Sequence, residues 1–164
     1  MTHTTSNQAV STYALLRRMA GPLMLALVLI GPASATEPSP SSTEAKTMKI
    51  RLTINGQATT ATLDDNATAR DFLSMLPLTL TLEDYASTEK IAYPPRKLST
   101  QGAPAGIDPD VGDITYYAPW GNLALFYKDF GYSTGLIRLG RFDAGVETLN
   151  TRGRLNVTIE AVGQ

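Results

Sequence analysis

The sequence contains no cysteine, and its only histidine, His3, lies near the start of the 164-residue chain. If the N-terminal segment is cleaved, as we predict below, His3 is lost. Neither a serine–histidine nor a cysteine–histidine nucleophile can then be built. Zinc, copper and iron also lack their usual imidazole and thiolate ligands, so we expect no metal and no cofactor. Since no disulfide supports the fold, the apolar core alone must stabilise the domain.

An excess of one charge is also missing. The chain has 14 lysine and arginine residues against 15 aspartate and glutamate residues, a formal net charge of −1. Nucleic-acid binding depends on a clustered basic surface, so we expect no nucleic-acid partner. Hydrophobic residues make up 43% of the chain and charged residues 18%, which is typical of a globular protein.

The N-terminal segment has the order of a secretory signal peptide. Arg17 and Arg18 precede an apolar run at residues 19–30, and small residues at 33–35 form a cleavage sequence. The apolar run is shorter than the ~20 residues that span a membrane. We predict cleavage after Ala35 and a periplasmic or secreted protein, with an uncleaved anchor and twin-arginine export as alternatives.

Cleavage divides the chain into three parts. Residues 1–35 are the predicted signal peptide, and residues 36–47, rich in Pro, Ser and Thr, are a predicted flexible linker. Residues 48–164 are the predicted domain. The mature chain loses His3 and keeps 12 basic against 15 acidic residues, a charge of −3. We expect membrane contact only during export or through an uncleaved N-terminal segment.

The domain opens with a hairpin followed by a helix. Residues 48–54 alternate between polar and apolar, and Asn55-Gly56 is a strong hairpin signal, which predicts paired strands over residues 48–63. Residues 64–76 are predicted as a helix, because Asp65 or Asn66 can cap it and Pro77 would end it.

The rest of the domain combines short strands with turns. Strands are predicted at residues 78–82, near 91, and at 113–117, 123–127, 136–142 and 155–159, with a long irregular stretch at 84–110 and a helical turn at 145–149. Short strands at this spacing predict a small closed barrel or a sandwich.

Several stretches resemble a bacterial family of cyclophilin-like proteins, many of unassigned function. They include residues 78–85 and 89–98, and above all residues 111–127 with the sequence VGDITYYAPWGNLALFY. The resemblance covers roughly residues 48–162 of the sequence. It implies a closed eight-stranded β-barrel with one or two short helices.

The resemblance does not by itself imply prolyl isomerase activity. True cyclophilins carry a Phe-His-Arg stretch and a Phe-Met-x-Gln stretch, and neither occurs here. The barrier to isomerisation, about 18–20 kcal/mol, comes from amide resonance, and an arginine donating to the prolyl nitrogen would lower it. Arg51, Arg96, Arg138 and Arg141 are the candidates.

Arg96 is the catalytic residue that we predict if the protein is an isomerase, because it lies in the long loop beside Pro95 and loops often carry function. Arg138 and Arg141 are three residues apart on one predicted strand. Strand alternation should therefore place them on opposite faces.

Aromatic residues gather around the turn at residues 119–122 and predict a shallow pocket for a peptide or small molecule. Trp120, the only tryptophan, is expected either to wall this pocket or to cap the barrel. Alternation should bury about half of the nearby aromatic side chains in the core. The predicted ligand-binding residues are Glu89, Tyr93, Trp120, Asn122, Tyr127, Phe130 and Tyr132.

Acidic residues allow further interpretations. Glu83-Asp84 and Glu89 flank Tyr85 and could serve as acid and base in glycoside hydrolysis, although such charges more often pin a loop by ion pairs. The acidic residues between 108 and 113 lack the spacing of a calcium loop.

Three functions therefore stay open. The first is a non-catalytic module that binds a peptide or small ligand, and the missing Phe-His-Arg stretch favours it. The second is a divergent peptidyl-prolyl cis-trans isomerase, and the third is a small-molecule enzyme that uses carboxylates or tyrosines.

Overall fold

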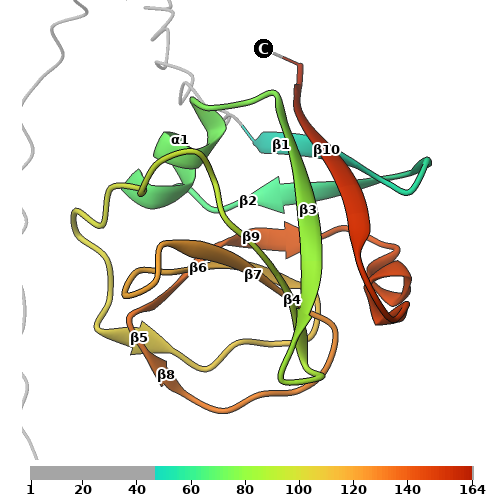
Figure 1. Cartoon of the computed structure of the whole chain (residues 1–164). Coiled ribbons are helices and arrows are strands. Elements are labelled where there is room, and N and C mark those ends of the chain that lie inside the picture. Colours follow the sequence, from blue (N-terminus) through green and yellow to red (C-terminus); the bar gives the residue numbers. More distant parts are fainter. Residues whose placement is uncertain (1–46, 164) are drawn as a thin grey trace, which may run out of the picture. The chain divides into compact units, whose positions relative to one another are not determined.

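Eight antiparallel strands close into a barrel in the computed structural model, which describes residues 47–163 (Figure 1). Around the barrel the strands follow the order β1-β10-β3-β4-β7-β6-β9-β2. The closed eight-stranded barrel is confirmed, and the sandwich alternative is wrong. The predicted signal peptide and nearly all of the predicted linker lie outside the described residues.

Ten strands, one α-helix and one 3-10 helix make up the described part of the chain. The strands are β1 (Met48–Ile54), β2 (Gln57–Leu63), β3 (Leu78–Tyr85), β4 (Glu89–Ala92), β5 (Gly106–Ile107), β6 (Asp113–Tyr117), β7 (Asn122–Phe126), β8 (Ser133–Thr134), β9 (Leu136–Phe142) and β10 (Leu155–Val162). Strands β5 and β8 pair with each other as a small separate sheet. Helix α1 is Ala67–Leu73 and the 3-10 helix η1 is Val146–Asn150.

The first hairpin forms as predicted. Ile54 pairs with Gln57, and the two residues between them have positive φ angles, 45° at Asn55 and 87° at Gly56. Asparagine and glycine tolerate this left-handed conformation, which matches the twist of the two strands.

Helix α1 is shorter than the predicted helix at residues 64–76. Asn66 caps it by accepting a hydrogen bond from the Ala69 backbone N–H at 2.8 Å, so the helix begins at Ala67. The backbone N–H of Asp64 instead donates to the Leu139 carbonyl of β9, which ties the preceding residues to the barrel. Within residues 47–163, no helix is long and apolar enough to cross a membrane.

A β-bulge in the pairing of β6 with β9 changes the direction of two arginines. Ile114 pairs with Gly140 but Thr115 pairs with Arg138, so Leu139 is an extra residue. Both Arg138 and Arg141 are therefore exposed on the outer surface. The prediction that they face opposite sides was wrong, because strict alternation fails at a bulge.

The core fills the barrel interior, and a smaller apolar cluster lies outside its wall. Inward-facing residues of β6 and β7, such as Ile114, Leu123 and Leu125, belong to the main core. Ala124, Phe126 and Leu136 form a second buried cluster with Ile91, Ile107 and Tyr117. This outer cluster is the floor of the candidate site.

Candidate functional site

Strands β4, β7, β6 and β9 are neighbours in the barrel and present one continuous outer surface. Residues directly opposite each other in an antiparallel pair point to the same face. Glu89 lies opposite Phe126, Ile91 opposite Ala124, and Tyr117 opposite both Asn122 and Leu136. Distant parts of the sequence thus meet on the barrel's outer wall.

A cavity of about 150 Å³ lies on this outer wall, and we call it the aromatic pocket. Its lining combines five aromatic side chains with aliphatic side chains and a few polar groups. The lining residues are Tyr85, Glu89, Ile91, Tyr117, Trp120, Asn122, Ala124, Phe126, Phe130, Ser133 and Leu136.

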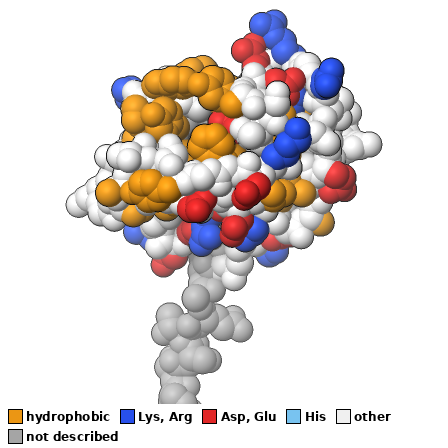
Figure 2. Space-filling model, turned by 90° about the horizontal axis from the view of Figure 1, so that it is seen from below, with side chains coloured by type: hydrophobic (Ala, Val, Ile, Leu, Met, Phe, Trp, Pro, Cys, Tyr) orange, Lys and Arg blue, Asp and Glu red, His pale blue; other side chains and the backbone are white. Residues whose placement is uncertain are grey.

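Trp120 is held between two tyrosines. Its ring centroid lies 5.5 Å from that of Tyr85 and 5.5 Å from that of Tyr117, both edge-to-face. Such pairs are favourable beyond the area that they bury. Trp120 is still 49% exposed, so this wall stays open to a ligand. In the view from below, most of the exposed hydrophobic side chains lie together on the left half of the surface (Figure 2).

Glu89 is the charged residue of the aromatic pocket. It is 6% exposed, and burial raises the pKa of its carboxyl group. The hydroxyl of Thr88 donates the one hydrogen bond that this carboxylate accepts from residues 47–163. A buried carboxylate with a single neutral donor can still pair with a ligand group.

Asn122 adds a second polar group, 2% exposed. Its Nδ2 donates to the carbonyl of Leu123 at 3.0 Å, but its buried Oδ1 accepts no hydrogen bond from the described residues. Buried amide oxygens are rarely left in this state.

The aromatic pocket brings together four of the seven predicted ligand-binding residues: Glu89, Trp120, Asn122 and Phe130. Tyr93 is 58% exposed and Tyr132 60% exposed, and neither lines it. Tyr127 directs its hydroxyl to Asp84, at 3.5 Å, and packs against the main core.

The predicted ligand-binding residues did not include seven of the residues that line the pocket: Tyr85, Ile91, Tyr117, Ala124, Phe126, Ser133 and Leu136. Strand alternation could have identified two of them. Tyr85 points to the same outer face as residues 79, 81 and 83 of its strand, and Ala124 points to the same face as Asn122. The pairing of β4 with β7 could not be derived from the chain order.

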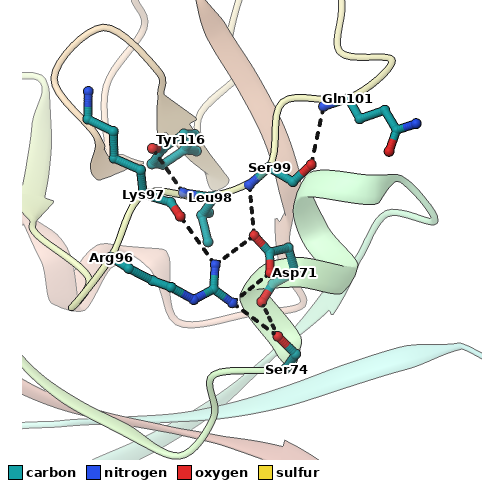
Figure 3. Close-up of polar contacts among 8 residues, drawn as sticks. All are labelled: Asp71, Ser74, Arg96, Lys97, Leu98, Ser99, Gln101 and Tyr116. Carbon is teal, nitrogen blue, oxygen red and sulfur yellow. Dashed lines mark hydrogen bonds and ion pairs between the residues drawn. The ribbon is translucent and has the colours of Figure 1, made fainter.

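Arg96, the predicted catalytic residue, is not among the residues that line the aromatic pocket. Its guanidinium group forms a bidentate pair with Asp71 of α1, with N–O distances of 2.7 and 2.9 Å (Figure 3). Asp71 also accepts from the Ser99 backbone N–H at 2.7 Å, and these partners lower its pKa to about 2. These contacts tie the long loop to helix α1.

The acidic residues near Tyr85 have mostly structural partners. Asp84 pairs with Lys90 at 2.7 Å and Glu83 with Arg154 at 2.8 Å. Of the predicted acid–base group, only Glu89 faces a cavity without a cationic partner among the described residues.

A larger cavity, about 490 Å³, lies between the start of α1, the loop around residue 103, and strands β6 and β9. Its charged groups are paired in part, since Arg138 donates to Asp64 at 2.8 Å. Burial raises the pKa of Asp113, whose Oδ1 lies 3.8 Å from the Arg141 Nε and accepts no hydrogen bond from the described residues. Most residues that line this cavity are polar and none is aromatic, so the aromatic pocket is the stronger candidate for binding an apolar or aromatic-flanked ligand group.

The comparisons with known proteins agree with the barrel. A family model described as the cyclophilin-like family matches residues 52–160. The chain belongs to the cyclophilin-like family. The solution structure of the hypothetical protein AF2241 from Archaeoglobus fulgidus is similar to this cyclophilin-like protein with a TM-score of 0.51 and 18% identity. That similarity covers 70% of this chain and 94% of the archaeal chain, and it concerns the fold. No curated protein matches this cyclophilin-like chain.

Proposed function

We propose that this cyclophilin-like protein is a non-catalytic binding module that holds a small molecule or part of a peptide in the aromatic pocket. The observation that carries the proposal is a cavity on the barrel's outer wall that joins five aromatic rings to a buried carboxylate and a buried amide. Apolar walls with a few buried polar groups are the usual composition of ligand sites.

A divergent prolyl isomerase is the alternative, because an apolar pocket would also hold a proline ring. Arginine-assisted isomerisation needs a guanidinium group beside that ring. The residues that line the aromatic pocket include no arginine, and Arg96 is engaged by Asp71. These features support binding over catalysis.

Thermal unfolding of the purified protein against a library of metabolites and short peptides tests the proposal. Ligands that raise the Tm of the native protein should not raise that of Trp120→Ala. Tyr93→Ala, which removes an exposed aromatic outside the pocket, is the matched control and should respond like the native protein. Ligands that stabilise the Trp120→Ala variant equally well would place the site elsewhere.

A protease-coupled assay on proline peptides tests the alternative. We expect no turnover above the uncatalysed rate. Turnover of the proline peptides that disappears in Arg96→Ala would replace the binding module with an isomerase. Chemical conversion of any stabilising compound from the library, followed separately, would favour the small-molecule enzyme.

We also propose that the protein is exported and that residues 1–35 are removed. The arginine pair, apolar run and small-residue cleavage sequence support this proposal. N-terminal sequencing of protein recovered from the periplasm or medium should begin at Thr36. A start within residues 1–35 would indicate an uncleaved anchor.

A further inference from the structure

We propose that the aromatic pocket binds a small alkylammonium group, presented by a free amine or by the lysine side chain of a peptide. The inference rests on the proposed function, because it names the ligand chemistry of the same pocket. Three features support it: a buried carboxylate without a cation, aromatic rings on both sides of that carboxylate, and a small volume.

The carboxylate of Glu89 has no cationic partner because of strand alternation. Lys90, the next residue, points to the opposite face of β4 and pairs with Asp84 at 2.7 Å. Asp84 lies directly opposite Lys90 in the pairing of β3 with β4, so these two charges satisfy each other. A carboxylate buried without a cation is unfavourable, and an ammonium group beside Glu89 would correct this.

Aromatic side chains flank Glu89 on both neighbouring strands. Tyr85 lies directly opposite it on β3, and Phe126 lies directly opposite it on β7. Trp120 packs on Tyr85 and extends the aromatic wall. The faces of such rings carry partial negative charge and attract cations, most strongly for tryptophan. A carboxylate among aromatic rings is thus a cation-binding arrangement.

The volume limits the size of the group. A water molecule takes up about 30 Å³ in liquid water. A cavity of about 150 Å³ therefore has room for roughly five groups of the size of a water molecule. That suits a short alkyl chain with one ammonium group. The unpaired Oδ1 of Asn122, in the wall of the same pocket, is a further acceptor.

Trp120 fluorescence provides the assay, because it is the only tryptophan of the chain and it lines the pocket. We expect n-butylammonium to bind at least about tenfold more tightly than the neutral 1-butanol, the size expected of a charge-assisted hydrogen bond. Glu89→Gln should abolish this preference. The control Glu83→Gln, on the adjacent strand and paired with Arg154, should keep it.

A second variant guards against a folding defect in Glu89→Gln. Tyr85→Leu keeps the carboxylate but removes one ring, and should weaken butylammonium binding more than butanol binding. Equal affinities for the two probes, or a preference that survives Glu89→Gln, would overturn the inference. The proposed function would stand in that case, since the library experiment judges it separately.

Peptides distinguish the two sources of the ammonium group. Tighter binding of an acetylated tripeptide with a central lysine than of butylammonium would assign the group to a polypeptide, and the reverse order to a free amine. Failure of both to change Trp120 fluorescence would overturn the inference.

The affinity for butylammonium should fall as the pH is lowered through the pKa of Glu89, because protonation removes the charge that the cation needs. Asp84 on the adjacent strand has a lowered pKa through its hydrogen bond with Lys90 and titrates at lower pH. Tyr127, which faces both acids, has a raised pKa, chiefly through burial. We therefore expect the change in affinity at acid pH to be absent in Glu89→Gln, which would assign this change to Glu89.

Discussion

Glu89 and Lys90 are adjacent, both buried and oppositely charged, yet they do not pair. Alternation along β4 sends Glu89 to the outer wall and Lys90 into the end of the barrel. Each side chain therefore has its own surroundings and its own consequence. Glu89 gives the aromatic pocket its charge, and Lys90 stabilises the barrel.

The Glu89→Gln substitution should stabilise the ligand-free protein near neutral pH. The pKa of Glu89 is raised in the folded state, so its stabilising contribution is present in acid and is lost as the pH rises through that pKa. Glutamine does not ionise, so the Glu89→Gln variant does not lose stability in this way as the pH rises. Urea unfolding should therefore show a stability gain that grows with pH across the acid range, and a gain independent of pH would contradict the assignment.

Removing the Arg96 side chain should affect stability and leave the pocket unchanged. Arg96 and Asp71 are 50% and 21% exposed, so solvent screens their bidentate pair. We expect Arg96→Ala to lower the free energy of unfolding only slightly. Its affinity for any ligand that acts through Trp120 should match that of the native protein, and a lost affinity would assign Arg96 to the site.

At the scale of elements, the β3–β4 hairpin positions the pocket. Its turn contains Ala86 and Ser87 with φ angles of 48° and 59°, a conformation that favours glycine or asparagine. Ser87→Gly should raise the free energy of unfolding by about 1 kcal/mol. Urea unfolding measures it, and a destabilised variant would show that the Ser87 side chain contributes more than its backbone costs.

Lys90 joins this hairpin to the segment before β10. Its Nζ donates to the carbonyls of Thr151 and Gly153, both at 2.7 Å, and pairs with Asp84. Lys90→Met would take the buried donor away from these three acceptors, which belong to exposed residues, so we expect a loss of about 2 kcal/mol in unfolding free energy. The exposed Lys49→Met is the control, with a loss below about 1 kcal/mol.

Local sequence signals predicted the strands and the helix well. They did not predict where the helix is shortened or where a strand contains a bulge. Asn55-Gly56 marks its hairpin because the turn needs residues that tolerate positive φ. The helix was predicted too long because the hydrogen bond from Asp64 to β9 is a tertiary contact. The directions of Arg138 and Arg141 were predicted wrongly because a bulge depends on the partner strand.

At the scale of the whole molecule, two carboxylates tie the long loop and the β9–η1 connection to the rest of the barrel. Asp71 pairs with Arg96, while Asp143 pairs with Lys49 and accepts from Thr60 and Thr62. These partners lower both pKa values to about 2. Ties between distant segments thus depend on ionised acids.

Stability should therefore decline in acid. A lowered pKa contributes stability above the unfolded value of 3.8, and this is lost as the pH falls toward about 2. The double variant Asp71→Asn/Asp143→Asn should be less stable near neutral pH and should show a flatter decline between those values. Calorimetric unfolding across the acid range measures this, and an unchanged slope would contradict the assignment.

The candidate site is a property of the closed barrel, which is why the sequence predicted it only in part. Trp120, Asn122 and Phe130 were found because they lie within a few residues of one turn. Tyr85, Ile91 and Leu136 join them only because β3, β4 and β9 reach the same wall through pairings distant in sequence. The arginine chosen from its loop position is instead held by helix α1.

The central claim is that the aromatic pocket is where this cyclophilin-like protein holds its ligand. Because the chain has a single tryptophan, its heteronuclear NMR spectrum contains one indole N–H resonance, that of Trp120. Titration with n-butylammonium chloride should move this resonance progressively to saturation, while sodium chloride at the same concentration should not. An indole resonance that stays in place while amide resonances around the larger polar cavity shift would contradict the claim.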